Sequence, residues 1–227
     1  MTRRGSDRRA RALRRQPPPP RRAAALRAQA REVYRDAILE AAERVFARSG
    51  FAGTRMAEVA GEAGLATGTL YNYFTGREEL LGSLIQRRSE ELIAAVKGAV
   101  EGARGGVRAL LVALLAATFE HTRRHRAFFA VLPAAAGISG RHMAAIARQY
   151  CESQRRYQEV VAQAMAGAVA DDALRGDVPE DLLVSAFTGA AHGVMRAWMA
   201  QDPEVKPLVD QAHAVVDLFL RGANPRS

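Results

Sequence analysis

The sequence has very little that could build disulfides or a large sheet. Cys151 is the single cysteine among 227 residues, so an internal disulfide is impossible and a disulfide-stapled secreted fold is excluded. Aromatic residues make up only 6% of the chain, and β-branched residues are sparse beside alanine, leucine, arginine and glutamate. This composition favours helices by propensity, and we expect an all-α protein.

Long hydrophobic runs are also missing. The longest uncharged apolar stretches, 109–119 and 182–195, are shorter than the ~20 residues that a membrane-spanning helix requires. The basic N-terminus could mimic the start of a signal peptide, but four consecutive prolines follow it and no apolar segment does. We therefore expect a cytoplasmic protein with no membrane partner.

Patterns that would indicate an enzyme or a metal site are few. The five histidines and Cys151 show no HExxH or CxxC spacing, and there is no GxxxxGK[ST] phosphate loop. Ser139 lacks the GxSxG spacing of a nucleophile elbow. We expect no catalytic residue, no metal and no cofactor, and hence no enzyme.

Positive charge is concentrated at the N-terminus. The net charge is +9, and residues 1–31 contain eleven arginines against Asp7 as their one acidic residue. With Pro17–Pro20 and few large apolar side chains, residues 1–30 are expected to form a disordered basic tail, a helix after Arg21 being the alternative for its last part. Such a tail either neutralises nucleic-acid phosphates or is simply solvated, and the charge run alone leaves both open.

Two apolar patterns after the tail predict a pair of helices. The first runs from Tyr34 to Ser49, where Gly50 suits a left-handed C-cap; Thr54 can cap the second, which Gly64 ends. Their inward residues follow the spacing of one buried helix face: Ile38, Leu39, Ala42, Val45 and Phe46 in the first, and Met56, Val59, Ala60 and Ala63 in the second.

A third, short helix completes a helix-turn-helix. It is expected from Thr67 to Phe74, with Leu70 and Phe74 directed to the core. Two short helices joined by a tight turn with a glycine are typical of this DNA-binding motif, whose second helix can enter a major groove. We place the DNA-binding domain at residues 31–80.

A family resemblance rests on residues 51–81, which read FAGTRMAEVAGEAGLATGTLYNYFTGREELL. This segment is similar to the DNA-binding signature of the TetR family of bacterial transcriptional repressors, above all in AGL at 63–65 and GTLYNYF at 68–74. The resemblance covers about residues 34–85. It implies a dimeric repressor that binds double-stranded DNA through the third helix.

Two positions depart from the family pattern. Ala66 stands where the family often has a serine N-cap, so the recognition helix begins less firmly unless Thr67 takes over the capping. Arg55 stands where threonine is frequent and could add a phosphate contact. Both departures leave the operator sequence unpredictable.

The candidate DNA contacts divide into two roles. Thr67 and Asn72 could meet base edges, and Gly68 would let the backbone approach the groove. The resemblance implies that Arg77 and the hydroxyls of Thr69, Tyr71 and Tyr73 reach phosphates. The two tyrosines could instead pack as a small aromatic core, but we favour a buried ring with the hydroxyl pointing outward. The full set is Thr54, Arg55, Thr67, Gly68, Thr69, Tyr71, Asn72, Tyr73 and Arg77.

The rest of the chain, 81–227, is expected to form a larger helical effector-binding and dimerisation domain, for about nine helices in all. Predicted helices occupy 77–101, 107–124, 127–132 stopped by Pro133, 139–169, 179–201, and a last one that Asp202-Pro203-Glu204 starts and Gly222 ends.

The resemblance implies a small-molecule effector between the helices of this domain, as helix bundles allow. Apolar residues at these spacings are more often ordinary core than ligand contacts. His192 is either a core histidine or a polar anchor for the ligand, and His125, in an arginine-rich segment, is expected to be solvated. Candidate pocket residues are Phe119, His121, Phe128, Phe129, Met143, Tyr150, His192 and Trp198.

A stripe of small residues recurs every four positions in the helix 179–201 and would let another helix approach closely. The last helix adds a broad apolar face, which suits a four-helix interface of a homodimer, although both faces could instead pack within one subunit. Candidate interface residues are Ser185, Gly189, Gly193, Ala197, Leu208, Ala212, Val215 and Phe219.

These observations predict a homodimeric, TetR-like repressor that binds a palindromic operator and is released by a small-molecule ligand. The alternative is a helical DNA-binding or nucleoid-associated protein without a ligand, in which the second domain only dimerises. Footprinting separates the two, because a repressor protects discrete palindromes whereas a nucleoid protein coats DNA broadly.

Overall fold

The fold is all-α, as the composition predicted. A computed structural model describes residues 20–136, 141–170, 174–201 and 207–223, and across these ranges it contains α-helices, one short 3₁₀ helix and no strand. In chain order the elements are α2 (Pro20–Gly53), α3 (Met56–Glu62), α4 (Thr67–Tyr71), α5 (Arg77–Gly102), α6 (Gly106–Arg124), α7 (Arg126–Ala136), α8 (Arg141–Ala170), α9 (Glu180–Met199), η1 (Val209–Gln211) and α10 (Ala212–Ala223).

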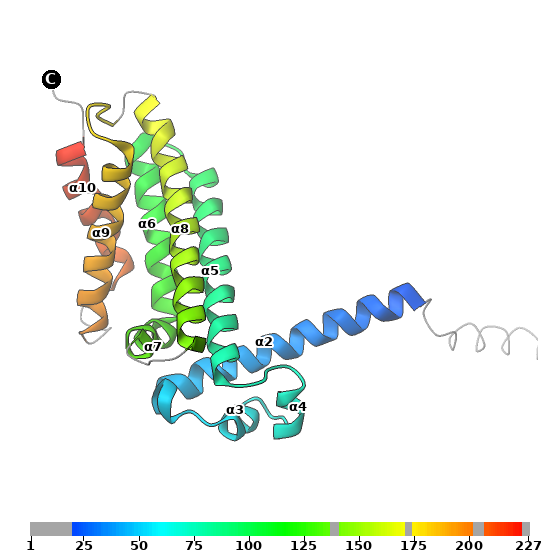
Figure 1. Ribbon diagram of the computed structural model, residues 1–227. Coiled ribbons are helices and arrows are strands. Elements are labelled where there is room, and N and C mark those ends of the chain that lie inside the picture. Colours follow the sequence, from blue (N-terminus) through cyan, green and yellow to red (C-terminus); the bar gives the residue numbers. More distant parts are fainter. Residues whose placement is uncertain (1–19, 137–140, 171–173, 202–206, 224–227) are drawn as a thin grey trace, which may run out of the picture.

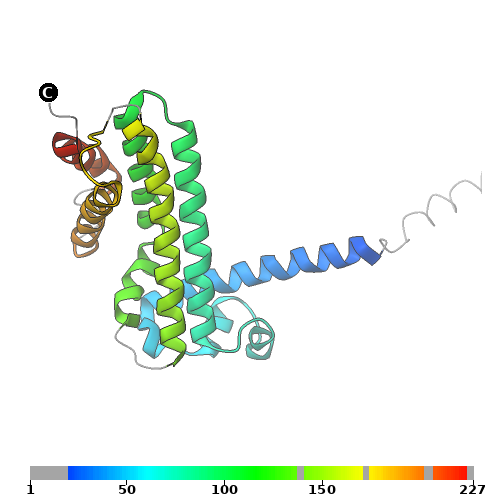
Figure 2. The same cartoon turned by 45° about the horizontal axis from the view of Figure 1, so that its top comes forward.

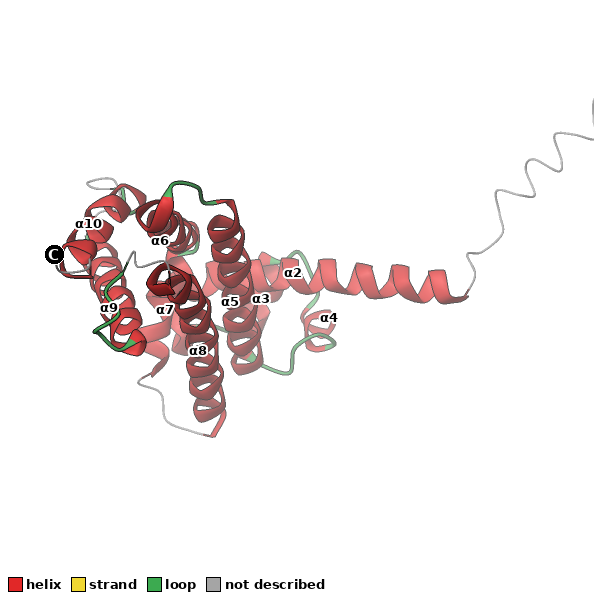
Figure 3. Cartoon of the chain, turned by 90° about the horizontal axis from the view of Figure 1, so that it is seen from above, coloured by secondary structure: helices red, strands yellow, loops and turns green. Residues whose placement is uncertain are grey.

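The elements form a small head and a larger body (Figure 1). We call α2 to α4 the head and α5 to α10 the body. In the body, α5 packs along α6 and α8, while α9 and α10 lie on the side away from α5, as the view from above also shows (Figure 3). The helix α2 crosses the end of the body, and its N-terminal half projects well beyond it (Figures 1 and 2). No described helix is both long and apolar enough to cross a membrane.

Two hydrophobic cores hold these parts together. The head core combines α2, α3 and α4 with the first turns of α5 and with Phe128, Val131 and Ile146 from α7 and α8. The body core lies among α5, α6, α8, α9 and α10 and includes Phe119, Phe187 and Trp198. Because α5 contributes to both cores, it connects the packing of the body directly to that of the head.

The start of α5 is fixed by a side chain from its own first turn. Glu79 Oε2 accepts hydrogen bonds from the backbone N–H and the hydroxyl of Thr75, each 2.8 Å long. The bond from the Thr75 backbone is the main reason that the pKa of Glu79 lies below its usual value. This arrangement satisfies an N–H group at the helix entrance and anchors the head-to-body connection.

The N-terminal helix begins earlier than expected. It starts at Pro20 rather than near Tyr34, so residues 21–30 take the helical alternative, and the side chains from Ala24 to Glu32 are exposed. The rest of the predicted tail, 1–19, lies outside the described residues. Gly50 has the predicted positive φ, 66°, where the helix kinks before Phe51.

The prediction that Thr54 caps the second helix is wrong. Arg55 is the N-cap residue and makes no side-chain capping bond. Thr54 is buried, and its hydroxyl donates instead to Gly50 O at 2.8 Å. This bond to a preceding carbonyl takes up the hydroxyl that a cap of α3 would need, and it stabilises the kink.

Two helix boundaries in the body were also predicted wrongly. The helix α7 continues through Pro133 to Ala136, because a proline removes one backbone donor without necessarily ending a helix. The last helix does not follow directly from Asp202-Pro203-Glu204, which lies outside the described residues: Pro207 is non-helical, η1 follows, and α10 starts at Ala212.

Candidate nucleic-acid interface

The short helix α4 presents polar groups to solvent and apolar groups to the head core. Thr67, Gly68 and Asn72 are exposed, whereas Leu70 and Phe74 are fully buried. The side chains of Thr67 and Asn72 make no hydrogen bond to other described residues. Their donors and acceptors are therefore free to meet base edges.

A glycine turn sets the angle between α3 and α4. Gly64 has a φ of 69°, and Leu65 N–H donates to Ala60 O at 2.8 Å across the turn. This is the left-handed exit expected for Gly64, and a side chain there would be strained. Ala66 is the N-cap of α4 without any side-chain cap, so Thr67 does not take over the missing serine's role.

The second helix is tied to the first by ion pairs. Glu62 accepts hydrogen bonds from Arg44 Nε and Arg48 Nη2, each at 2.7 Å. These two bonds hold the pKa of Glu62 below its usual value, Arg44 contributing most. Together with buried Val59 and Ala60, they keep α3 against α2 and so position the turn.

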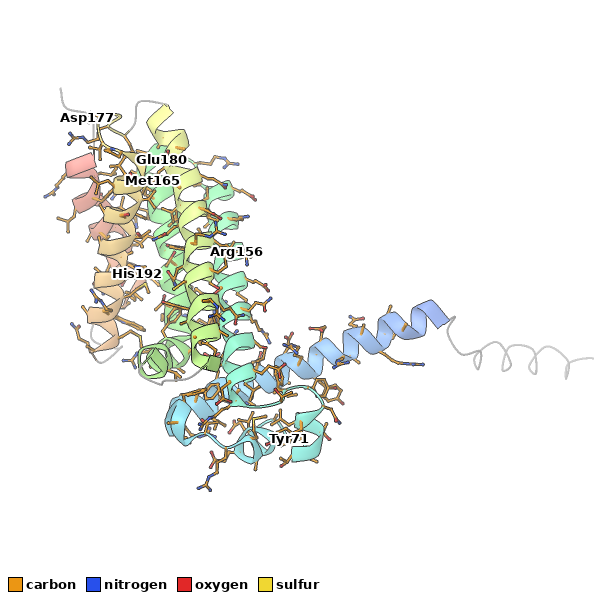
Figure 4. The ribbon with its side chains drawn as sticks, in the orientation of Figure 1. Tyr71, Arg156, Met165, Asp177, Glu180 and His192 are labelled. Atoms are coloured by element: carbon orange, nitrogen blue, oxygen red, sulfur yellow. The ribbon has the colours of Figure 1, made fainter. Side chains whose placement is uncertain are left out.

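The two tyrosines after the recognition helix are placed differently. Tyr71 is 51% exposed and lies on the outer side of the head, so its ring is not buried as we favoured (Figure 4). Tyr73 is half-buried and packs against the head core; its ring centroid lies 6.3 Å from that of Tyr34. The guanidinium of Arg31 lies 5.7 Å from the Tyr73 ring centroid. Tyr73 thus links the region after α4 to the projecting helix α2.

Arg77 is bound to the head itself. Its Nη1 donates to Ala52 O at 2.6 Å, and its guanidinium lies 5.1 Å from the ring centroid of Phe51. This contact closes the head by connecting the start of α5 to the end of α2. Of the remaining candidates, Arg55 is exposed, Thr69 is half-buried, and buried Thr54 serves the turn.

Sequence reasoning missed the part of α2 that adjoins α4. Arg31, Tyr34 and Arg35 are spaced i, i+3, i+4 and so share one face of the helix. Arg35 lies 4.5 Å from the ring centroid of Phe74 and donates to Ser83 Oγ at 2.8 Å. The spacing was readable in the sequence, but the partners are about 40 residues away and only the fold brings them together.

Most of the candidate pocket residues lie in the cores. Phe119 and Trp198 are buried in the body core, and Phe128 is buried in the head core. These placements match the alternative that such apolar residues are ordinary core residues. Phe129 and Tyr150 pack half-buried against the head core, and the side chain of Met143 lies outside the described residues. His192 is half-buried on α9, where burial above all lowers its pKa (Figure 4).

His121 is the candidate that lines a cavity. The cavity has a volume of about 610 Å³ and lies between α2, α5 and α6, where the head meets the body. Its lining is charged rather than apolar, with three carboxylates and three guanidinium groups beside two histidines. His125, expected to be solvated, is half-buried there and faces Glu43 and Glu91, because the end of α6 packs against α2 and α5.

The candidate dimer residues fall into two sets. Ser185, Gly189 and Ala197 are exposed and Gly193 is partly exposed, so the small-residue stripe of α9 faces away from its own subunit. Leu208, Ala212 and Val215 are instead buried in the body core, and Phe219 packs on Phe187 at 5.1 Å between ring centroids. These four residues pack within their own subunit. Leu182 on α9 and Leu218 on α10, which were not predicted, are also exposed apolar side chains.

An exposed polar helix in a helix-turn-helix head on an all-helical body defines a helix-turn-helix DNA-binding protein. Residues 38–84 match the family described as bacterial regulatory proteins, tetR family. The head of this chain is therefore similar to the DNA-binding domain of TetR-family transcriptional regulators, as the sequence resemblance implied.

In sequence, the similarity to a curated relative covers about a third of this chain, whereas the similarity in structure extends over most of it. An uncharacterized HTH-type transcriptional regulator of Mycobacterium tuberculosis is 40% identical over 67 residues, which is 30% of this chain and 33% of that protein. The matched segment thus spans about a third of the relative.

Two solved structures share the fold. A fatty acid degradation regulator, FadR, from Bacillus halodurans superposes with a TM-score of 0.72 at 21% identity, over 82% of this chain and 94% of that one. FadR from Bacillus subtilis, in complex with stearoyl-CoA, gives a TM-score of 0.72 at 18% identity, over 83% and 98% of the two chains.

Proposed function

We propose that the protein is a homodimeric repressor that binds a palindromic operator through α4 and leaves it when a small molecule binds the body. The observation that carries this proposal is the exposure of Thr67 and Asn72 directly above the buried anchor Leu70. The buried side chain of Leu70 holds α4 against the head core, and the exposed polar groups of Thr67 and Asn72 can select bases. The protein would act in the cytoplasm as a regulator and not as an enzyme.

The dimer is supported by the outer face of α9. Exposed small residues along that face, together with the 57%-exposed Leu182 on the same helix and the 69%-exposed Leu218 on α10, suit a close helix-to-helix contact between two subunits. Two heads would then contact two half-sites about one DNA turn, or a multiple of it, apart.

Release by a ligand requires a ligand that prefers one arrangement of the heads over the other. The helix α5 belongs to both cores, so a ligand that displaces it in the body would also move the head. The structural neighbour that binds stearoyl-CoA makes a long-chain acyl-CoA the first ligand to test.

The test combines DNA footprinting with ligand addition. The full chain should protect discrete palindromic sites, and long-chain acyl-CoA should release the DNA and raise the melting temperature of the protein. Short-chain acyl-CoA and free CoA are the matched controls for the acyl chain. Broad, unstructured protection with no effect of any ligand would instead support the alternative of a nucleoid-associated protein that only dimerises through its body.

A further inference from the structure

Three potential metal ligands meet where the head joins the body. Glu91 of α5, His121 of α6 and His125, the C-cap residue of α6, each offer a ligand atom, and these atoms all lie within 4.8 Å of one another. The two histidines are four residues apart, and their ring centroids are 4.7 Å apart. They lie on the wall of the 610 Å³ cavity, which gives an ion a path to solvent.

The imidazole of His121 is an unusual group to bury without a partner. The residue is 6% exposed, and its Nε2 has no hydrogen-bond partner in the described structure. A buried polar atom without a partner costs about 1–3 kcal/mol, so such atoms are rare unless another group completes them. Burial, followed by the charge of His125, lowers the pKa of His121 to about 4.

The spacing of the other two ligands fits a tetrahedral ion. His125 Nε2 and Glu91 Oε2 are 3.6 Å apart. Two ligands at ~2.1 Å from a tetrahedral Zn²⁺ are ~3.4 Å apart, so small side-chain rotations would close the site. On the other side of the same ring, Nδ1 faces Glu43 Oε1 at 3.6 Å, the position in which a carboxylate orients a metal-bound histidine.

The nearby arginines do not make the site positive. The cavity wall carries Glu40, Glu91 and Glu120 against Arg87, Arg88 and Arg124, and Glu43 adds a carboxylate behind them. Glu91 already accepts hydrogen bonds from Arg87 and Arg88 at 3.0 and 2.7 Å. A carboxylate has about four lone-pair positions, so it can keep these bonds and still contact an ion.

We propose that Glu91, His121 and His125 bind one divalent transition-metal ion of the Zn²⁺ type, with the fourth position open to the cavity. Two imidazoles and one carboxylate are a ligand set that suits this ion. The expectation of no metal rested on the absence of HExxH and CxxC spacings, whereas here the histidines are i, i+4 and the third ligand comes from a separate helix. The proposal does not depend on the regulatory function.

The experiment is a Zn²⁺ titration of the full-length chain after chelator treatment, followed by calorimetry or equilibrium dialysis. One Zn²⁺ should bind per chain, and His121→Gln and His125→Gln should each weaken binding at least about tenfold, because even outer partners of a metal site are worth about 10–100-fold. The matched control is His213→Gln, which changes an exposed histidine on α10 and should leave binding unchanged.

Circular dichroism melts check the fold of each variant. If His121→Gln does not fold, His125→Gln alone decides, because His125 is only partly buried. Absence of saturable binding near one equivalent would overturn the proposal. Binding that His125→Gln leaves unchanged, or that His213→Gln reduces equally, would overturn it as well.

Discussion

The guanidinium of Arg88 on α5 donates from both Nε and Nη2 to Oε2 of Glu43 on α2, at 2.9 and 2.5 Å. Both side chains are buried, and the pair joins the head to the body. Burial tends to raise the pKa of Glu43, but His125 and Arg88 together outweigh it and hold that pKa below its usual value. The low pKa of Glu43 in this buried site therefore depends on His125 and Arg88.

Arg88→Met should destabilise the protein by about 3 kcal/mol, because it leaves Glu43 buried without its guanidinium partner. Urea denaturation measures this loss. Adding Glu43→Met to the first change should recover much of it. Arg108→Gln is the matched control, since its pair with Asp217 is exposed to solvent and should contribute little to stability. Equal losses in both single variants would contradict a buried link.

Substitutions on the recognition helix should separate reading from positioning. Thr67→Ala and Asn72→Ala should change the preference among operators by ~1–3 kcal/mol for each base contact that is removed. Tyr71→Phe should weaken binding to operator and unrelated DNA alike, because a phosphate contact carries no sequence information. Gel-shift titrations with operator and scrambled DNA measure both effects; if none of the three changes affects binding, α4 is not the reader.

Removal of residues 1–30 should lower DNA affinity with little change in operator preference. The deleted part includes the exposed, arginine-containing start of α2, which projects from the head. The dependence of log K on log salt should become shallower, with a slope change of ~0.9 for each phosphate that the shortened chain no longer neutralises. Arg104→Gln, at an exposed loop between α5 and α6, is the control for charge alone. Identical salt slopes in truncated and full chains would mean that this segment does not contact DNA.

Gly193→Leu should shift the protein toward monomer and weaken operator binding. A Cβ at Gly193 would meet nothing within 4 Å inside the subunit, so the added side chain acts on a partner helix rather than on the chain's own packing. Gly98→Leu is the matched control: that glycine is also exposed on a helix and equally unobstructed, but lies on α5. Light scattering measures the oligomeric state, and a fully dimeric Gly193→Leu protein would refute this interface.

Tyr157→Phe should lower the free energy of unfolding by about 1 kcal/mol at neutral pH. Thr118 Oγ1 donates to Leu114 O, so Tyr157 must donate in its 3.0 Å bond to Thr118, which joins α8 to α6. Burial raises the pKa of Tyr157 to about 12, above the unfolded value of about 10.

The sign of the pH effect follows from that difference. The folded state holds the hydroxyl proton more tightly, so the stabilisation is complete below pH ~10 and is lost as pH rises through 12. Unfolding free energies of the protein and of Tyr157→Phe should therefore converge above pH ~10.

The helix-turn-helix could be predicted because its determinants are local. Gly64, Leu65 and Leu70 lie within seven positions of one another, and the turn conformation follows from what glycine allows. Thr54 failed as a cap because the kink at Gly50 decided where its hydroxyl lies, and a threonine before a helix does not reveal such a competing acceptor.

The sequence by itself determined the helical class, the position of the head and the small-residue stripe of α9. Periodicity and residue size can be read along the chain without knowing which elements pack together. Only the tertiary structure decided that Leu208 and Ala212 face their own core and that the stripe faces outward. It also brought together Glu43 of α2, Arg88 of α5 and His125 at the end of α6. Pairings of this kind depend on how helices cross, because a sequence pattern defines the face of a helix but not the element that packs against it.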